Sequence, residues 1–277
     1  MKKLLLSAFV ICLAGTSIAQ ESPLWMRHCA LSPDGTTIAF TYKGDIYTVP
    51  STGGRATQIT TNPAFDTEPV WSPDSKQIAF ASDRMGSLDV FVVSSEGGAP
   101  QRLTTHSGSE KPVAYKDNKH ILFTANIAPS AEDAGFPSGQ FQQVYEVAVT
   151  GGRPAMFSSM PMECISINKE GVMLYQDKKG YEDYWRKHQV SPIARDIWTY
   201  TPGKKPVYQK QTTFGGEDRE PVWSPDGKSF YYLSEEKGSF NIFQRTPGTT
   251  TSQQITFHTK HPVRFLSIST TGTLLWL

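Results

Sequence analysis

The segment Ser32-Pro33-Asp34-Gly35 recurs almost unchanged as Ser72-Pro73-Asp74-Ser75 and as Ser224-Pro225-Asp226-Gly227. More divergent copies begin at Tyr115, Asn168 and Ser269, so neighbouring copies start 40 to 56 residues apart. A repeat of about 40–45 residues that is rich in short strands is typical of a β-propeller, in which each repeat builds one four-stranded blade. The sequence therefore predicts an all-β fold: a β-propeller of four-stranded blades, with six visible repeats and the last of them truncated.

Each copy of the segment has the composition of a tight turn between two strands. Proline presets φ, aspartate bonds to its own backbone, and glycine accepts a positive φ. Apolar residues spaced by two follow the turn, as in Ile38 and Phe40, which places both on one face of a strand. The next strand opens with a polar residue in most repeats, as in Asp45-Ile46-Tyr47. Prolines are expected to open the following inner strands: Pro69, Pro112, Pro221 and Pro262.

Two groups of repeated residues have a structural and a functional interpretation. Trp71 and Trp223 directly precede turns, and we expect them to fill the tapered space between blades. The alternative is a platform on which a ligand stacks. Asp45, Asp89 and Asp196 open equivalent strands and resemble metal ligands when they are considered singly. Their recurrence once per blade favours hydrogen-bonding struts to neighbouring turns.

The first 19 residues have the three parts of a secretory signal peptide. Lys2 and Lys3 form the basic start, residues 4–14 the apolar core, and residues 17–19 the small-residue cleavage site. The core is too short for a membrane span. We therefore expect an exported protein, periplasmic or secreted, with a propeller at residues 20–277. Without the two lysines the 27 basic residues become 25 against 26 acidic ones, so the net charge changes from +1 to −1. This balance argues against nucleic acid and anionic membranes as partners.

Catalytic and metal-binding patterns are missing from the sequence. It contains no Gly-x-Ser-x-Gly segment, no phosphate-binding glycine-rich loop and no His-Glu-x-x-His segment. No pair of cysteines or histidines has the spacing of a zinc site. Cys29 and Cys164 fall on different repeats, which favours free buried thiols over a disulfide. We therefore expect no catalytic residue, no metal ligand, no cofactor and no peptidase activity in this chain.

The sixth repeat ends half-built. It begins at Pro262 and reaches its second strand at Leu275-Trp276-Leu277. A half-built blade leaves a sheet edge unpaired. We therefore expect these residues to be the N-terminal part of a longer protein, whose closed ring has six or seven blades.

Two neighbouring repeats carry insertions in the same connection. The step from the strand after the turn to the next strand is 6 residues in repeat one, 21 in repeat three and 22 in repeat four. The insertions are Asn126–Gln142 and Gly180–Arg195. One connection emerges on one face of a propeller, so we expect both insertions side by side near the central opening, where insertions often mark the binding face.

The second insertion is aromatic and charged. It can be an ordered loop held by its own salt links to Glu182 and Asp183, or a docking surface for a carboxylate-bearing peptide or another domain. Arginine binds carboxylates bidentately, so Arg186 or Arg195 is the expected contact. The candidate docking residues are Tyr184, Trp185, Arg186, Lys187, His188 and Arg195.

The repeat pattern, Pro-x-Trp-Ser-Pro-Asp-Gly followed by Asp-Ile-Tyr and Gly-Gly, resembles the propeller repeats of TolB-type proteins and of tricorn-type peptidases. The resemblance covers residues 24–277. The segment from Tyr184 to His188 and the later Arg195-Asp196-Ile197-Trp198 are similar to bacterial secreted tricorn-like serine peptidases. Such proteins begin with this propeller, and a second propeller, a PDZ-like domain and a protease domain follow. The resemblance thus implies a peptidase whose catalytic residues lie outside this chain.

Two hypotheses follow from the resemblance. In the first, this is the non-catalytic propeller of an exported tricorn-like peptidase that guides or filters peptides and docks the catalytic domain. In the second, it is a stand-alone periplasmic propeller that binds a protein partner, as TolB-type modules do. An open reading frame that continues past Leu277 into PDZ-like and protease domains would favour the first.

Overall fold

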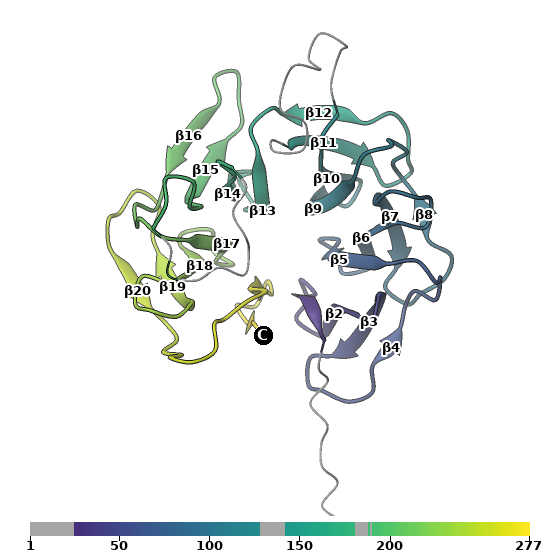
Figure 1. The fold of residues 1–277 in the computed structure, drawn as a ribbon, viewed down its shortest axis with the longest axis horizontal. Helices are drawn as coiled ribbons and strands as arrows, with labels where there is room; N and C mark the ends of the chain where they lie inside the picture. Colours follow the sequence, from purple (N-terminus) through teal and green to yellow (C-terminus); the bar gives the residue numbers. More distant parts are fainter. Residues whose placement is uncertain (1–24, 128–141, 181–187, 189) are drawn as a thin grey trace, which may run out of the picture.

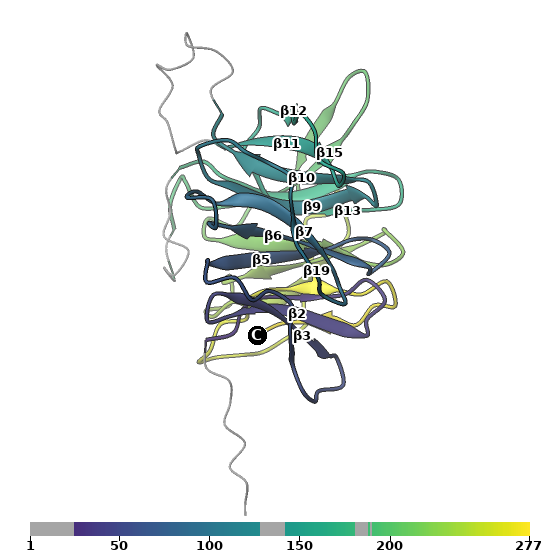
Figure 2. The ribbon, with the colours of Figure 1, turned by 90° about the vertical axis from the view of Figure 1, so that its right-hand side faces the viewer.

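Six β-sheets surround a central axis and form a disc (Figure 1). The computed structural model describes residues 25–127, 142–180, 188 and 190–277. Figure 2 shows the disc from its edge, with the strands running across its thickness. Within the described residues five sheets have four antiparallel strands and the sixth has two, so the predicted propeller with a truncated last blade is confirmed.

The strands follow one another along the chain, blade by blade. Blade one contains β1 (Arg27–Leu31), β2 (Thr37–Tyr42), β3 (Asp45–Pro50) and β4 (Thr57–Gln58). Blade two contains β5 (Asp66–Trp71), β6 (Gln77–Ser82), β7 (Asp89–Ser94) and β8 (Gln101–Arg102). Blade three contains β9 (Glu110–Asp117), β10 (His120–Ala125), β11 (Gln143–Ala148) and β12 (Ala155–Ser158). Blade four contains β13 (Met162–Ile167), β14 (Met173–Asp177), β15 (Ile197–Thr201) and β16 (Val207–Lys210). Blade five contains β17 (Asp218–Trp223), β18 (Phe230–Ser234), β19 (Asn241–Arg245) and β20 (Ser252–Gln254), and the sixth sheet β21 (Ser267–Ile268) and β22 (Leu274–Leu275).

The inner strands of all six sheets close into a ring. β21 lies between β17 and β1, the inner strands of blades five and one. The Leu31 backbone N–H donates to Ser267 Oγ at 3.0 Å, and the Thr270 N–H donates to the Pro33 carbonyl at 2.7 Å. The described ring therefore has six blade positions.

The repeated turns also link several neighbouring blades. Within a turn the serine hydroxyl donates to the aspartate, at 2.5 Å for Ser32 and Asp34. The Asp34 backbone N–H then donates to Ser75 Oγ of blade two at 3.2 Å. Gly35 has a φ of 78°, and a Cβ there would lie 3.2 Å from the Ser269 Cβ. The turns thus lie together on one side of the disc, which we call the turn face.

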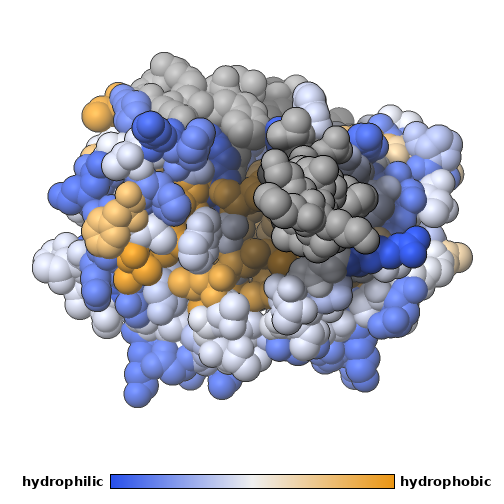
Figure 3. Space-filling model, turned by 90° about the horizontal axis from the view of Figure 1, so that it is seen from below, coloured by the Kyte–Doolittle hydropathy of each residue, from blue (hydrophilic) through white to orange (hydrophobic). Residues whose placement is uncertain are grey.

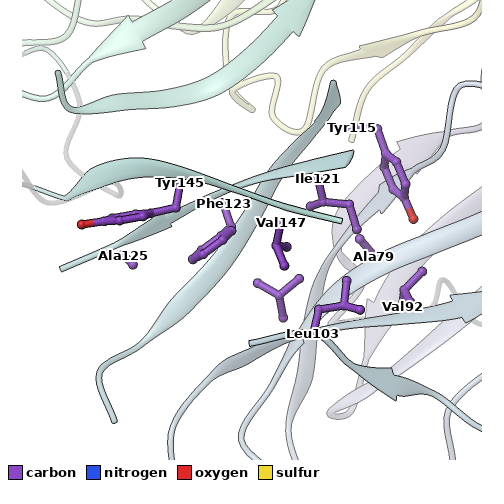
Figure 4. Close-up of a cluster of buried hydrophobic side chains, with 10 residues drawn as sticks. Ala79, Val92, Leu103, Tyr115, Ile121, Phe123, Ala125, Tyr145 and Val147 are labelled. Atoms are coloured by element: carbon purple, nitrogen blue, oxygen red, sulfur yellow. The ribbon is translucent and has the colours of Figure 1, made fainter. Parts of the chain in front are cut away.

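Apolar residues of neighbouring blades pack together between the sheets. Figure 4 shows one such cluster, in which Ala79 and Leu103 of blade two meet Ile121 and Val147 of blade three. The rings of Phe123 and Tyr145 stack in the same cluster, with their centroids 5.7 Å apart. The spacing of two after each turn therefore places apolar side chains in the contacts between blades, as the sequence predicts.

The repeated tryptophans and aspartates have structural roles here. Trp71 is 7% exposed, and its indole N–H donates to the Ala30 carbonyl of blade one at 2.9 Å. Trp223 makes the equivalent bond to the Val172 carbonyl of blade four at 3.1 Å. Asp45 accepts from Gln58 and Thr60, so it braces the outer strand of its own blade rather than a neighbouring turn. In the part of the chain that the structure describes, no cluster of three or more His, Cys, Asp or Glu side chains could hold a metal ion.

Three features differ from the sequence prediction, and all three lie on the inner strands or in the turns that follow them. None of the four predicted prolines opens an inner strand: Pro69, Pro112 and Pro221 lie inside β5, β9 and β17, and Pro262 precedes β21. Irregular register leaves residues of β5, β9 and β17 without ladder partners, which a proline tolerates. The turn of blade three is one residue shorter, since Tyr115 pairs with Ile121 as Trp71 pairs with Ile78. Cys29 and Cys164 are both free, as predicted, but Cys164 is exposed because it lies at the irregularity in β13.

The rim of the disc is apolar beside the sixth sheet. Figure 3 shows an orange patch on this side of the molecule. Exposed apolar residues of the last segment include Phe257, Trp276 and Leu277, which are 74%, 40% and 46% exposed. Among the described residues no helix is long and apolar enough to cross a membrane.

Glu110 of blade three and Asp89 of blade two form an acidic pair between the blades, so we expect the stability of the protein to depend on pH. Burial raises the pKa of Glu110 to about 7, and the Asp89 carboxylate adds to the effect. A carboxyl whose pKa is higher in the folded than in the unfolded state contributes its full stabilisation of the fold at a pH below the unfolded pKa. For Glu110 this contribution is lost as the pH rises from about 4.5 to about 7. Glu110→Gln keeps a neutral group, so at pH 8 we expect the free energy of unfolding to increase by about 1–3 kcal/mol.

Urea unfolding at a series of pH values measures this effect. The difference between Glu110→Gln and the unchanged protein should shrink as the pH falls toward 4.5, the ordinary value of the glutamate pKa. Glu96→Gln, at an exposed glutamate of blade two, serves as the control and should change little at any pH. A difference for Glu110→Gln that grows at acid pH would contradict the assignment.

Candidate functional site

The inner strands of all six blades meet around one axis, and the side chains at the two ends of this axis differ in chemistry. Each inner strand begins at the face opposite the turns and ends at the turn face. Charged residues such as Glu68, Lys111 and Glu220 lie near the beginning of these strands, whereas Val70, Val113 and Ile167 line the pocket nearer their ends. The ring therefore places a charged wall at one end of the axis and an apolar pocket at the other.

The charged wall is built from residues with strained backbone. They interrupt the pairing of the inner strands, and a positive φ is unusual for any residue with a side chain. They lie at equivalent positions of five blades. They are His28 (φ 51°), Glu68 (φ 55°), Cys164 (φ 50°), Glu220 (φ 50°) and Phe265 (φ 56°).

Electrostatic effects place these side chains around the axis. The Glu68 carboxylate of blade two contributes to the pKa of Cys164 in blade four, although blade three lies between them in the ring. Lys111 of blade three likewise acts on His28 of blade one. Interactions between alternate blades have to pass across the channel. We therefore assign these four side chains to the channel wall.

Most charges of this wall already have partners. Lys111 Nζ lies 2.6 Å from Glu68 Oε1, and Glu220 Oε2 accepts from the Leu266 backbone N–H at 2.8 Å. Burial lowers the pKa of His28, whose ring packs against Phe265 with centroids 5.2 Å apart. The Cys164 side chain is exposed to solvent but surrounded by the inner strands of the ring. Desolvation by the surrounding protein and the nearby Glu220 and Glu163 carboxylates raise the pKa of its thiol well above its ordinary value. Cys164 is thus an accessible but weakly reactive thiol.

The turn-face end of the channel is a pocket of about 350 Å³. Its walls come from every blade, and its apolar members include Val70 of blade two, Val113 of blade three, Ile167 of blade four and Ile268 of the sixth sheet. Asn168, Lys169, Glu170 and Asp226 supply polar groups at the same pocket. The volume lies within the roughly 300–1,000 Å³ of small-molecule sites.

The predicted docking residues lie mostly outside the described part of the chain. Tyr184, Trp185, Arg186 and Lys187 are among these undescribed residues. His188 is exposed, and its backbone N–H donates to Glu235 Oε2 of blade five at 2.6 Å.

Arg195 is described and is buried within an ion network. Its guanidinium lies 3.1 Å from Glu163 Oε2 and 3.5 Å from Glu217 Oε1, and Glu217 Oε2 lies 2.8 Å from Arg219 Nε. Burial disfavours the charge of Arg195, but the two carboxylates outweigh it and raise the pKa of the guanidinium above its ordinary value. Arg195 links blades four and five here. The predicted partners Glu182 and Asp183 lie outside the described residues. A role in binding an incoming carboxylate stays a prediction and would require Glu163 or Glu217 to be displaced.

The ends of both insertions lie on the face opposite the turns. Ala125 ends β10 and Gln143 begins β11, and Asp177 ends β14 before Ile197 begins β15, so the two insertions join equivalent strand ends. The end of the second insertion reaches blade five, because the Ser191 N–H donates to the Gly215 carbonyl at 3.3 Å. Whether the two insertions meet beside the opening depends on residues 128–141, 181–187 and 189, which lie outside the described part.

The channel wall could not be found by searching for catalytic motifs. Its residues are single positions on different repeats, and they come together only when the ring closes. A signal was nevertheless present, since Glu68 and Glu220 both directly precede the proline of an inner strand. Aligning the repeats at that proline would have indicated residues that face the axis.

The comparison with known proteins agrees with this architecture. Residues 23–275 match the protein family described as "Tricorn protease N-terminal beta propeller domain". The chain is 39% identical over 213 residues to "Tricorn protease homolog 1" of Streptomyces coelicolor, which covers 76% of this chain and 19% of that protein. It is 34% identical over 218 residues to an uncharacterised protein of Agrobacterium fabrum, which covers 73% of this chain and 68% of that protein. The chain thus spans about a fifth of the length of the Streptomyces relative.

Solved structures show the same fold at low sequence identity. The crystal structure of the tricorn protease superposes with a TM-score of 0.75 at 17% identity, covering 92% of this chain and 24% of that one. A putative TolB from Agrobacterium tumefaciens superposes with a TM-score of 0.65 at 14% identity, covering 84% of this chain and 81% of that one. At these identities the likeness concerns the fold alone.

Proposed function

The chain belongs to the family of tricorn protease N-terminal β-propeller domains, and we propose that it is the non-catalytic propeller of an exported serine peptidase of this type. In this role it guides or filters peptides for a catalytic domain and docks that domain. The expectation of export comes from the signal-peptide pattern of residues 1–19. The predicted partners are a peptide or protein ligand and the PDZ-like and protease domains of the same protein.

The observation that carries the proposal is the pocket on the axis of the six inner strands, which we interpret as one end of an axial channel. An extended peptide is a single strand without tertiary structure, so a narrow axial channel admits it and excludes folded proteins. A charged wall and an apolar pocket in series give the channel two means of selecting what enters. The docking function is placed on the face opposite the turns, where both insertions begin and end.

Protection of the Cys164 thiol tests whether peptides enter the channel. The chain is labelled with N-ethylmaleimide at about pH 8.5, where a weakly acidic thiol still reacts slowly. Mass spectrometry then measures labelling of the segment that contains Cys164. A tryptic digest of casein, freed of active trypsin, should slow the labelling roughly threefold at a peptide concentration of about twice the dissociation constant.

Intact folded lysozyme at the same mass concentration is the control and should not slow the labelling. Cys29 is buried and should stay unlabelled in the folded protein. Equal labelling rates with and without the digest, over a wide range of digest concentrations, would rule out a peptide channel.

The alternative is a stand-alone TolB-like propeller that binds a protein partner. The putative TolB of Agrobacterium tumefaciens has the same propeller fold, with a TM-score of 0.65. The two functions differ in what binds the chain. A separately produced tricorn-type PDZ and protease fragment should bind the chain under the first, whereas a partner unrelated to proteolysis should bind it under the second.

A further inference from the structure

The apolar pocket at the turn-face end of the channel differs from the rest of the axis. At the charged wall each ionic group that a ligand could use is already engaged, as Lys111 is by Glu68 at 2.6 Å. In the pocket, by contrast, Val70, Val113, Ile167 and Ile268 are partly exposed. An apolar ligand group would bury these side chains without breaking an existing bond.

The geometry of the pocket limits what it can hold. Its volume of about 350 Å³ accommodates one or two large side chains together with a short piece of backbone. The pocket is lined by inner-strand or turn residues of every blade, so it lies on the axis of the ring, and a peptide that enters along this axis from the turn face meets it first. Asn168, Lys169 and Glu170 stand among its lining residues and offer polar groups to a peptide backbone.

Resting on the function proposed above, we propose that this axial pocket selects peptides by binding a large aliphatic or aromatic side chain. Val70, Val113, Ile167 and Ile268 form the apolar contact. A leucine or phenylalanine side chain gains by leaving water against these four side chains, whereas a charged side chain loses hydration there. The charged lining residues Lys169, Glu170 and Asp226 lie in exposed turns at the mouth of the pocket and not among the four apolar side chains. The substrate class is therefore extended peptides with an apolar residue, and peptides of charged residues are excluded.

Val70 and Val149 provide a matched pair for testing this proposal. Both are partly buried valines that pack against the same apolar cluster between blades two and three. Val70 lines the pocket, whereas Val149 lies at the connection between β11 and β12 and does not. A lysine at either position disturbs the same cluster, but a lysine at residue 70 alone places a charge in the pocket.

The probes are four blocked peptides, acetyl-Gly-Gly-Leu-Gly-Gly-amide and its analogues with Phe, Asp or Lys at the centre. Calorimetry gives their dissociation constants, and Cys164 labelling shows whether each enters the channel. The Leu and Phe peptides should bind about 10- to 100-fold more tightly than the Asp and Lys peptides. Val70→Lys should weaken binding of the Leu peptide at least tenfold, which corresponds roughly to losing the burial of one leucine side chain. Val149→Lys should change the dissociation constant of the Leu peptide by less than about twofold. Val70→Thr keeps the volume of the side chain, so it replaces Val70→Lys if the lysine variant does not fold, and about a threefold or larger loss is expected from its buried hydroxyl.

Each outcome separates this proposal from the function on which it rests. If all four peptides and the casein digest protect Cys164 equally, peptides use the channel but the pocket does not select them, and the proposal is wrong. The same holds if the Leu peptide binds both Val70 variants as tightly as the unchanged protein. If neither the peptides nor the digest protects Cys164, the peptide-guiding function itself is wrong.

Discussion

Replacing Glu217 by alanine is expected to lower the free energy of unfolding by about 3–5 kcal/mol, the usual cost of removing one partner from a buried ion pair. The Glu217 side chain is 3% exposed and lies between Arg195 and Arg219, whose side chains are 7% and 2% exposed. Without the carboxylate two buried guanidiniums lose a counter-ion that joins them. Urea unfolding, monitored by tryptophan fluorescence, measures the loss.

Two variants show whether the loss comes from the buried charge. Glu217→Gln keeps an acceptor for Arg219 but removes the negative charge. Its loss in free energy of unfolding should therefore lie between zero and the loss of the alanine variant. Glu236→Ala removes a glutamate that is 39% exposed and pairs with Lys237 at 3.3 Å. An exposed pair of this kind contributes little, so its loss should stay below about 1 kcal/mol. Equal losses for Glu217→Ala and Glu236→Ala would show that the network adds no stability to the contact between blades four and five.

The blades could be predicted from the sequence because their signals are local. A turn such as Ser32-Pro33-Asp34-Gly35 forms its own hydrogen bonds within four residues, so its chemistry is visible without any tertiary contact. The alternation of apolar residues after it sets which side chains meet the neighbouring blade. Trp71 was recognised as a filler of the space between blades for the same reason, since its position relative to the turn repeats in blade five.

The channel and the ion network could not be predicted, because they depend on which blades become neighbours. Arg195 is separated in sequence from Glu163 by 32 residues and from Glu217 by 22, and the sequence offered only an incoming carboxylate or Glu182 and Asp183 as its partners. The exposure of Cys164 follows from a backbone irregularity in β13, which leaves no composition signal. Long-range charge pairing and local bulges are thus the parts of this site that a repeat pattern does not contain.

Replacing Trp71 by alanine is expected to lower the free energy of unfolding by about 3–5 kcal/mol, as for other large buried aromatic residues. The indole packs with Ala39, Ile46 and Ile59 of blade one and with Ile78 and Phe80 of blade two, so its removal leaves a cavity between two blades. It also removes the donor that bonds the Ala30 carbonyl at 2.9 Å.

Trp71→Phe separates these two contributions, because phenylalanine keeps most of the packing and loses the N–H group. Its expected loss is about 1–3 kcal/mol, the cost of a buried carbonyl left without a donor together with the smaller ring. Trp25→Ala is the matched control, since Trp25 is 68% exposed and its removal should change stability by less than about 0.5 kcal/mol. A tryptophan kept for stacking a ligand would be replaceable without loss in the free protein, so a Trp71→Ala protein as stable as Trp25→Ala would favour the stacking platform over the filler between blades.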